Sequence, residues 1–487
     1  MNKFNWGMRV CVLFLLWVGA AVSLPAQTFK TLHSFDGTDG AGPAASLVQA
    51  TNGNLYGTTE SGGTGNCSGG CGTIFKISPS GRLTTLYKFC SRGGNRCTDG
   101  ELPVAGLVQG TDGNFYGTTY YGGANSCNVN GYNGCGTVFK ITPGGKLTTL
   151  HSFNNTDGAV PASLIQATNG ALYGTAGGGA NGAGTVFTIT PGGVLTTLYN
   201  FCSQINCTDG DEPNTGLIQA TDGNFYGTTF AGGANNTCVY AGCGTVFTIT
   251  PGGVLTTLYS FCSQINCTDG DNPLAGLVQG TDGNLYGTTF EGGTNACPNG
   301  CGTVFTITPG GALTTLHSFD GTDGANTYAG LVQATNGNFY GTMSNGGPIG
   351  AGTIFTITPS GMLTTLQSFD LTDGANPNAG LVQDTNGTFY GTTGTGGANS
   401  VGTIFSLSVG LGPFVATQLA SGQVGAAVKI LGTNLTGATS VTFNGTPATF
   451  KVKSKSEITT TVPTGATTGT VQVVTPGGTL SSNVPSG

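Results

Sequence analysis

The sequence predicts an all-β protein: a seven-bladed β-propeller closed by its N-terminal strand, followed by a small β-sandwich. Glycine supplies 89 of the 487 residues and charged residues only 7%, and long amphipathic helical patterns are absent. Apolar residues recur instead in short runs separated by turn residues, as is usual for strands. Self-similarity at a fixed spacing indicates a repeat architecture. The tripeptide Tyr-Gly-Thr recurs 50 to 60 residues apart, with its tyrosine at Tyr56, Tyr116, Tyr173, Tyr226, Tyr286, Tyr340 and Tyr390.

Each repeat contains four short β-like runs, as the second repeat illustrates. Asp112-Gly113 separates its first two runs and Pro143-Gly144-Gly145 its last two, and both are turn sequences that suit antiparallel hairpins. Threonine, valine, isoleucine and aromatic residues fill the runs. Four antiparallel strands in such a unit form one propeller blade. The runs lie at residues 106–109, 115–119, 136–142 and 147–153.

The fourth run, which starts Leu-Thr-Thr-Leu, is present in six repeats and missing from the seventh. It begins at residues 83, 147, 195, 255, 313 and 363. A related segment, Phe-Lys-Thr-Leu-His-Ser-Phe, stands at residues 29–35 near the N-terminus. We therefore predict that residues 29–35 form the outer strand of the last blade. This strand would close the ring without leaving an open sheet edge.

The first 26 residues have the pattern of a secretory signal peptide. Lys3 and Arg9 precede an apolar run at residues 10–22, and small residues follow it. Cleavage fits best after Ala26, with Ser23 as the alternative position. No later stretch of about 18 apolar residues occurs, so we expect no direct membrane insertion. These features predict a secreted, extracellular or cell-surface protein, with the periplasm as an alternative.

Fourteen cysteines follow the signal, which itself contains Cys11, and they form seven close pairs. An even number of cysteines in a secreted chain predicts disulfides. Zinc binding is the alternative explanation for closely spaced cysteines. Each pair stands alone, however, without a histidine or a second pair in register, which disfavours a four-ligand zinc site. The predicted disulfides are Cys67–Cys71, Cys90–Cys97, Cys127–Cys135, Cys202–Cys207, Cys238–Cys243, Cys262–Cys267 and Cys297–Cys301.

The order of the strands places all these pairs on one face of the propeller. The loops between second and third strands and the crossovers between blades emerge there, and we call it the loop face. Aromatic residues in these loops are candidate ligand-binding residues, because exposed aromatic rings stack on sugars or pack against protein partners. For Phe230 and Phe290 the alternative is packing against the next blade. The candidates are Tyr120, Tyr121, Tyr132, Phe230, Tyr240 and Phe290.

The tripeptide Thr-Asp-Gly recurs in all seven crossovers. An aspartate before glycine forms turns and caps backbone N–H groups, which is the structural interpretation. Calcium is the alternative, since carboxylates and carbonyls on one loop suit a hard cation, although no copy has the dense acidic pattern of a dedicated calcium loop. We expect no other cofactor and no other metal. The aspartates are Asp39, Asp99, Asp157, Asp209, Asp269, Asp323 and Asp373.

The remaining ionisable residues do not point to catalysis or to nucleic acid. His33, His151 and His317 share one slot of the fourth run, where other repeats carry tyrosine or glutamine, so a Ser-His-Asp site is not expected. A net charge of -7 with 14 basic residues argues against a nucleic-acid partner. The alternative is a glycan-acting hydrolase that uses two carboxylates. Its candidates in loop-face loops are Glu60, Glu101, Glu212 and Glu291.

Two family resemblances add to this interpretation. The block from Thr-Asp-Gly through Gly-Leu-Val-Gln and Asp-Gly-Asn-Phe-Tyr-Gly-Thr-Thr to Leu-Thr-Thr-Leu resembles the GloVer tandem-repeat family, which implies a secreted choice-of-anchor protein without a particular activity. Residues 428–435, 441–445, 458–463 and 471–478 resemble an IPT/TIG domain, an immunoglobulin-like β-sandwich. The predicted domains are a signal peptide at 1–26, the propeller at 27–409 and the immunoglobulin-like domain at 411–487.

These patterns favour a non-catalytic, secreted or cell-surface binding protein. Its ligand would be an extracellular glycan or surface polymer, recognised by the disulfide-bonded loops, because preorganised loops lose less entropy on binding. One alternative is a structural or adhesive scaffold that binds a surface protein. The other is the polysaccharide hydrolase.

Overall fold

The computed structural model describes residues 27–63, 67–91, 97–129, 132–235, 237–238, 241–294, 297–418 and 422–482. The predicted signal peptide at 1–26 lies outside these ranges. In the described part the regular structure is almost entirely strand, with two short 3-10 helices, η1 (Ile205–Cys207) and η2 (Ile265–Cys267). The all-β prediction is confirmed.

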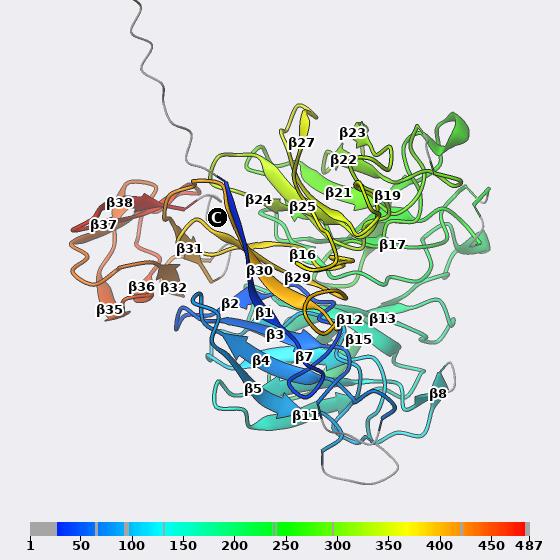
Figure 1. Cartoon of the computed structure of the whole chain (residues 1–487), viewed down its shortest axis with the longest axis horizontal. Helices are drawn as coiled ribbons and strands as arrows, with labels where there is room; N and C mark the ends of the chain where they lie inside the picture. The colour runs from blue at the N-terminus through cyan, green and yellow to red at the C-terminus, as the bar shows by residue number, and fades with distance from the viewer. Residues whose placement is uncertain are drawn as a thin grey trace, which may run out of the picture.

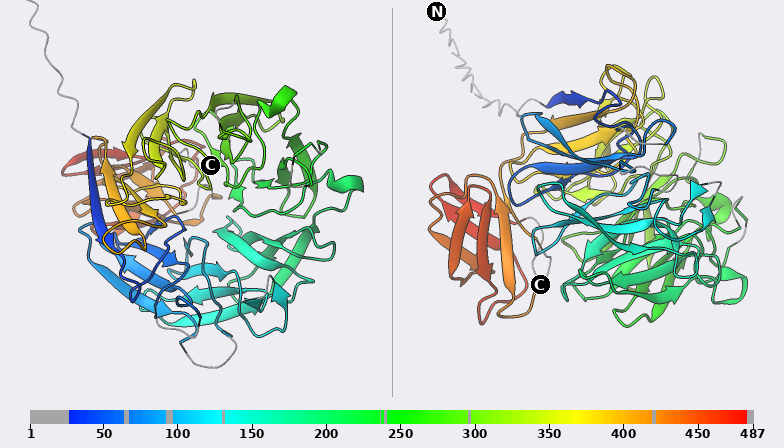
Figure 2. Two further views of the ribbon diagram at one scale, coloured as in Figure 1. Left: turned by 45° about the vertical axis from the view of Figure 1, so that its right-hand side comes forward. Right: turned by 90° about the horizontal axis from the view of Figure 1, so that it is seen from below.

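The repeat region builds seven four-stranded antiparallel sheets within the described residues. Figure 2 shows these sheets following one another around a central axis in a propeller-like ring. From first to fourth strand they are β2 (Val48–Gln49), β3 (Leu55–Thr59), β4 (Thr73–Ile77), β5 (Leu83–Lys88); β6 (Val108–Gln109), β7 (Phe115–Thr119), β10 (Thr137–Ile141), β11 (Leu147–Ser152); β12 (Ala159–Gln166), β13 (Leu172–Gly177), β14 (Thr185–Ile189), β15 (Leu195–Asn200); β16 (Ile218–Gln219), β17 (Phe225–Thr229), β18 (Thr245–Ile249), β19 (Leu255–Ser260); β20 (Val278–Gln279), β21 (Leu285–Thr289), β22 (Thr303–Ile307), β23 (Leu313–Ser318); β24 (Val332–Gln333), β25 (Phe339–Met343), β26 (Thr353–Ile357), β27 (Leu363–Ser368); and β28 (Val382–Gln383), β29 (Phe389–Thr393), β30 (Thr403–Ser408), β1 (Thr28–Ser34). A two-stranded hairpin, β8 (Asn128–Val129) and β9 (Tyr132–Asn133), extends one loop.

The recurring Tyr-Gly-Thr lies in the second strand of each sheet, and each of its residues meets a packing requirement. In the first sheet, Tyr56 stacks on Phe115 of the next sheet with ring centroids 4.1 Å apart. Gly57 has no room for a side chain, because an added Cβ would lie 2.6 Å from the ring of Phe75. Thr58 Oγ1 donates a 3.1 Å hydrogen bond to a backbone carbonyl of the next sheet. The tripeptide therefore recurs because it joins neighbouring sheets.

A ring of hydrogen bonds connects the sheets near their first strands. The Oε1 of the glutamine that ends each first strand accepts the backbone N–H of a threonine in the first turn of the preceding sheet. The last bond, between Thr385 N and Gln49 Oε1 at 3.1 Å, connects the seventh sheet to the first. The repeated tyrosines and glutamines therefore have a structural role, because they join neighbouring sheets. The glutamine–threonine pairs are Gln109–Thr51, Gln166–Thr111, Gln219–Thr168, Gln279–Thr221, Gln333–Thr281, Gln383–Thr335 and Gln49–Thr385.

The outer strand of the seventh sheet comes from the N-terminus. β1 pairs antiparallel with β30, with Phe29 opposite Leu407 and Ser34 opposite Thr403. Figure 1 shows β1 lying along β30. Phe29 also stacks on Phe405 with ring centroids 5.3 Å apart. The predicted position of residues 29–35 is confirmed.

The C-terminal segment forms two further four-stranded sheets packed face to face. Their shared core includes Ile430, Val441, Ile458 and Val471. The side chains of β37 alternate between buried and exposed, as expected when one face of a sheet packs on another. The sheets are β31 (Val415–Thr417), β32 (Ala427–Gly432), β36 (Glu457–Thr461), β35 (Phe450–Ser454), and β34 (Thr446–Pro447), β33 (Ser440–Phe443), β37 (Val471–Thr475), β38 (Gly478–Ser481).

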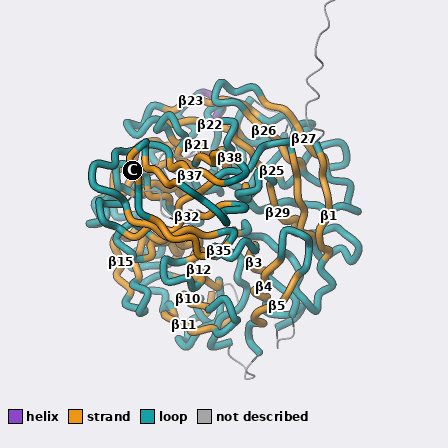
Figure 3. The backbone as a smooth tube through the Cα atoms, turned by 90° about the vertical axis from the view of Figure 1, so that its left-hand side faces the viewer, coloured by secondary structure: helices purple, strands orange, loops and turns teal. Residues whose placement is uncertain are grey.

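This sandwich is docked on the ring by hydrogen bonds to turn carbonyls (Figures 2 and 3). Ser456 Oγ donates to the Thr51 carbonyl at 2.7 Å, and Lys429 Nζ donates to the Thr111 carbonyl at 2.8 Å. Both carbonyls belong to turns between first and second strands, at the opposite end of the sheets from the loop face. The described part of the sandwich therefore leaves the loop face open.

Candidate functional site

A cavity of about 1000 Å³ lies at the centre of the ring. Every sheet contributes residues at or just before its first strand, because these strands are innermost in the ring. The lining also includes loop-face residues such as Tyr120 and Gly178, so the cavity is reached from that face. One lining residue from each sheet in turn is Ala44, Val104, Ser163, Asn214, Leu274, Tyr328 and Asn378.

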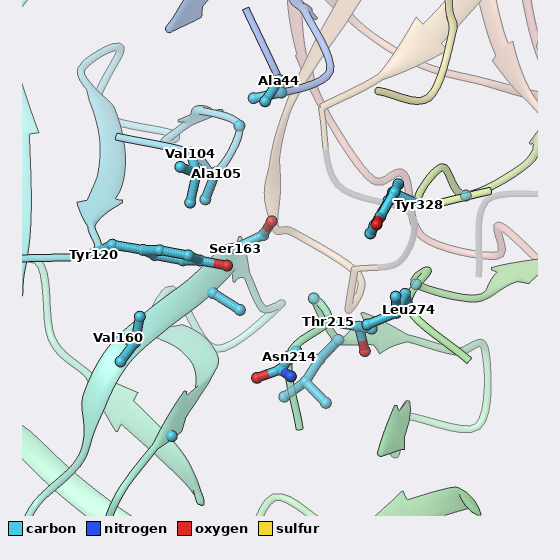
Figure 4. A pocket seen from close by; sticks show the side chains of 18 of the residues that line it. Ala44, Val104, Ala105, Tyr120, Val160, Ser163, Asn214, Thr215, Leu274 and Tyr328 are labelled. Carbon is cyan, nitrogen blue, oxygen red and sulfur yellow. The ribbon is translucent and has the colours of Figure 1, made fainter. Parts of the chain in front are cut away.

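Aromatic side chains face one another across the cavity. Figure 4 shows Tyr120 and Tyr328 pointing into it from opposite sides. Tyr328 is 46% exposed, and its ring centroid lies 4.9 Å from that of Phe290 on the neighbouring sheet, which holds the ring in place. The ring of Tyr121 lies 6.2 Å from that of Tyr120. Burial raises the pKa of Tyr120, and Tyr121 and Glu60 raise it further, so its hydroxyl stays protonated as a hydrogen-bond donor at neutral pH.

One polar part of the lining lies just before β16, and Ser46, Asn155 and Asn378 add polar side chains elsewhere. Asn214 Nδ2 lies 3.5 Å from Glu212 Oε2, and the Asn214 amide N donates to the Glu212 carbonyl at 2.8 Å. Glu212 adopts a positive φ of 54°, a strained backbone conformation for a non-glycine residue. Among the described lining residues, Glu212 is the single Asp, Glu, His, Lys or Arg. The cavity thus offers aromatic faces and neutral hydrogen-bonding groups with one carboxylate.

The structure brings some of the predicted aromatic residues together and separates others. Tyr120 and Tyr121 line the cavity. Phe290 does not line it but supports Tyr328, which fits the packing alternative. Phe230 also lies outside the lining, and its carbonyl accepts a 2.9 Å hydrogen bond from Asn272. The side chain of Tyr132 and the whole of Tyr240 lie outside the described residues.

Sequence reasoning missed Tyr328, although the repeats hold a signal for it. In six repeats, the residue five positions before the glutamine that ends the first strand varies from repeat to repeat. It stands between a proline or threonine and a small residue. All six residues at this position line the cavity. We call it the rim position. It is occupied by Ala44, Val104, Asn214, Leu274, Tyr328 and Asn378.

All seven predicted disulfides are present. The expectation that each cysteine pair stands alone is wrong for two sets, because a crossover folds back onto the second-to-third loop of the same sheet. Cys67 Sγ lies 3.9 Å from Cys97 Sγ, so two disulfides of the first sheet are in contact. Within each of two clusters the sulfur atoms lie within 4.8 Å of one another. One cluster consists of Cys67, Cys71, Cys90 and Cys97, and the other of Cys238, Cys262 and Cys267.

The seven Thr-Asp-Gly aspartates accept hydrogen bonds from the chain itself. In the first crossover, Asp39 Oδ1 accepts the Asp36 N–H at 3.0 Å, and Asp39 Oδ2 lies 2.7 Å from His33 Nε2. The capping interpretation accounts for these contacts. Histidine, tyrosine and glutamine interchange in the fourth strand because each reaches this carboxylate. The pairs are His33–Asp39, Tyr87–Asp99, His151–Asp157, Tyr199–Asp209, Tyr259–Asp269, His317–Asp323 and Gln367–Asp373.

One carboxylate in the crossovers is buried next to other acids. Asp271 is 7% exposed, and its Oδ1 has no hydrogen-bond partner among the described residues. Burial, together with the charges of Glu291 and Asp269, raises the pKa of Asp271 to about 7. Asp271 and Glu291 also exchange backbone hydrogen bonds of 3.1 and 3.2 Å. Neither residue lines the cavity.

A propeller-like ring with disulfide-bonded loops around a central cavity, and a sandwich docked on its opposite face, defines an all-β binding scaffold. The chain belongs to the Gloeobacter/Verrucomicrobia repeat family, whose model matches residues 19–129, 126–297 and 294–430. Residues 414–486 match the IPT/TIG domain. No curated protein matches the chain. In the part of the chain that the structure describes, no helix has the length and apolar character needed to cross a membrane.

The chain is similar to several solved structures at low sequence identity. A putative 6-phosphogluconolactonase from Bacteroides fragilis is 17% identical, covers 73% of this chain and 94% of its own, and has a TM-score of 0.43. The β-propeller domain of the trilobed protease from Pyrococcus furiosus is 10% identical, with coverages of 75% and 94% and a TM-score of 0.40. A gluconolactonase from Xanthomonas campestris is 14% identical, with coverages of 56% and 78% and a TM-score of 0.34.

Proposed function

We propose that this protein is a secreted or cell-surface binding protein without catalytic activity. Its repeat region, residues 27–409, acts as a seven-bladed propeller closed by β1, and it holds a glycan or other surface polymer at the central cavity. The immunoglobulin-like domain, residues 411–487, acts as a spacer or attachment module on the opposite face. Residues 1–26 direct the chain to an oxidising compartment, where its seven disulfides form.

The placement of Tyr120 and Tyr328 carries this proposal. Two aromatic rings on opposite walls of a large, open cavity form platforms on which a ligand can stack from both sides (Figure 4). Ligand sites are concave and combine apolar walls with a few polar groups, which describes this lining. The short disulfide rings restrict the surrounding loops, so less entropy is lost when a ligand binds.

Retention on immobilised polysaccharides tests the proposal. The mature protein, with its disulfides intact, is passed over a panel of insoluble and immobilised polymers. We expect retention on at least one polymer, and loss of that retention when Tyr120→Ala and Tyr328→Ala are combined. Val194→Ala, a 69% exposed residue in a turn at the other end of the sheets, is the matched control and should bind like the wild type. Absence of retention on every polymer would refute the proposal.

A protein-binding scaffold is the second candidate function, and two exposed side chains favour it. Ile205 and Ile265 are each 86% exposed, in equivalent crossovers on the loop face. Such exposed apolar residues are anchors for a protein partner. Cross-linking of the mature protein on intact cells, followed by identification of the cross-linked protein, tests this candidate. Replacement of both isoleucines by serine should abolish cross-linking, whereas the double tyrosine variant should leave it unchanged.

The carboxylate-pair hydrolase is favoured most by the raised pKa of Asp271 beside Glu291. Burial also raises the pKa of the candidates Glu60 and Glu101. Release of reducing ends from the polymers that retain the protein tests it. Activity that is present in the wild type and lost in both Asp271→Asn and Glu291→Gln would establish a hydrolase. Unchanged activity in both variants, or none in the wild type, would exclude this pair.

A further inference from the structure

The cavity is asymmetric although the ring around it is built from near-identical repeats. The rim position differs from sheet to sheet, while the positions on either side of it are almost always proline and alanine. Valine and leucine stand there in the second and fifth sheets, tyrosine in the sixth, and asparagine in the fourth and seventh. Tyr120 and Tyr121 add two more aromatic rings in the second sheet. A ligand that enters this cavity therefore meets aromatic rings on two opposite walls (Figure 4) and amides on the fourth and seventh sheets, so its contacts depend on its orientation.

The charge of the lining restricts what the cavity can accept. No lysine, arginine or histidine belongs to its described lining, and Glu212 is the single carboxylate. The protein as a whole carries a formal net charge of -7. An anionic ligand would lose its hydration in the cavity without gaining a cationic partner, which is unfavourable. The lining therefore disfavours an anionic ligand, and the hydrogen-bonding groups of an uncharged ligand would pair with hydroxyls, amides and one carboxylate.

The size and rigidity of the cavity favour several joined rings over one small molecule. Its volume of about 1000 Å³ lies at the upper end of the range of roughly 300–1,000 Å³ for ligand pockets. Tyr328 is held by Phe290, and Tyr120 by Tyr121, so both platforms are fixed before a ligand arrives. Fixed platforms suit stiff rings that present an apolar C–H face and stack without reorganising the site.

We propose that the cavity binds an uncharged oligosaccharide segment, with sugar rings stacked on Tyr120 and Tyr328 and hydroxyl groups hydrogen-bonded to Glu212 and Asn214. This inference rests on the proposed binding function and specifies its ligand class and its site. Uronate-rich, sulfated and phosphorylated polymers are excluded as ligands. The outer crossovers, including those of Ile205 and Ile265, make no contact with the sugar.

Affinity electrophoresis of the mature protein, with its disulfides intact, tests this inference. The gels contain either a neutral polymer (β-glucan, mannan, xylan or galactan) or an anionic one (polygalacturonate or alginate). We expect retardation by at least one neutral polymer and by neither anionic polymer. Tyr328→Ala and Tyr120→Ala should each weaken that binding roughly tenfold, as the loss of one aromatic contact implies. Tyr328→Phe, which keeps the ring, should stay within about threefold of the wild type.

Two further variants make the result independent of folding defects. Val194→Ala lies outside the cavity and should bind like the wild type. Asn214→Lys places a cation in the lining, and it should weaken binding of the neutral polymer while creating measurable binding to polygalacturonate. Gain of a new ligand cannot come from a misfolded variant.

The outcomes separate this inference from the proposed function. Tighter binding of the anionic polymers by the wild type overturns the inference and leaves polymer binding at the cavity standing. Unchanged neutral binding in both tyrosine variants overturns the inference and also the proposed binding at the cavity. Retention of a protein partner that is lost in the tyrosine variants also overturns the inference, because the cavity would then hold a peptide. Absence of binding to every polymer overturns both the inference and the proposed function.

Discussion

Replacement of Asp384 by alanine is expected to stabilise the protein at alkaline pH and not at acidic pH. Asp384 occupies a position, directly after the repeat glutamine, where the other repeats have alanine or glycine. Its side chain is 2% exposed. Oδ1 accepts the Asn386 N–H at 2.9 Å, whereas Oδ2 has no hydrogen-bond partner among the described residues. The residues at the equivalent position are Ala50, Gly110, Ala167, Ala220, Gly280 and Ala334.

The size and sign of the effect follow from the pKa of this carboxyl group. Burial raises the pKa of Asp384 from 3.8 to about 6. Between these two values the unfolded chain loses its proton while the folded protein keeps it, so stability falls as pH rises. Two pKa units correspond to about 3 kcal/mol of folding stability. The folded protein loses this stability as the pH rises from about 4 to about 7, because the buried carboxyl group must then ionise. The alanine variant also loses the hydrogen bond to Asn386, worth about 1 kcal/mol at any pH.

Urea unfolding of the wild type and of Asp384→Ala at pH 4 and pH 8 measures this effect. We expect the variant to be more stable by about 2 kcal/mol at pH 8 and less stable by about 1 kcal/mol at pH 4. Asp36→Ala is the control of opposite sign, since hydrogen bonds from Thr38 and Asp39 lower the pKa of Asp36 to about 2. That variant should be less stable than the wild type by nearly the same amount at pH 8 and at pH 4, and the loss should fade only below pH 4, as the pH falls toward 2. An equal effect of Asp384→Ala at both pH values would refute the reasoning.

Three further predictions concern the ring. Gly117→Ala should destabilise the protein by about 2 kcal/mol in urea unfolding, because the new Cβ would lie 2.6 Å from a phenylalanine ring. The control Gly144→Ala, whose new Cβ would have no atom closer than 3.8 Å, should have no measurable effect. His33→Tyr should keep its stability within about 0.5 kcal/mol of the wild type, since tyrosine reaches the equivalent aspartate in other sheets. His33→Leu cannot pair with Asp39 and should lose about 1 to 2 kcal/mol. Equal losses in the two variants would contradict the pairing with Asp39. Deletion of residues 27–34 removes β1, exposes the edge of β30 and should give concentration-dependent oligomers in size-exclusion chromatography; a stable monomer would show that the strand is dispensable.

The sequence predicted the repeat architecture because its determinants are local and occur many times. Gly57 and its equivalents are required by a ring packed against the backbone, and Asp112-Gly113 by a tight turn. The disulfides were predictable for the same reason, since the partner cysteines are separated by only 4 to 8 residues. The role of β1 followed from a missing copy of one strand.

The cavity could not be read from the sequence, because distance from the axis depends on how the sheets close around it. Tyr328 lies in the loop before a first strand, and nothing in its local sequence marks it as a cavity residue. Phe230 and Phe290 occupy equivalent positions in the fourth and fifth sheets, so the sequence does not distinguish them. Only the assembled sheets show that Tyr328 faces the cavity (Figure 4) while Phe290 packs against it from behind.

The sequence by itself determined which residues recur, and hence the sheets, their turns, the position of β1 and the cysteine pairs, because each depends on neighbours within one repeat or the next. The tertiary structure decided everything that depends on residues from distant repeats. It brought Tyr120 and Tyr328 to opposite walls of one cavity, placed the disulfide of Cys67 against that of Cys97, and docked Ser456 on the turn at Thr51. These contacts join segments that local patterns treat as independent, so they exist only once the ring has formed.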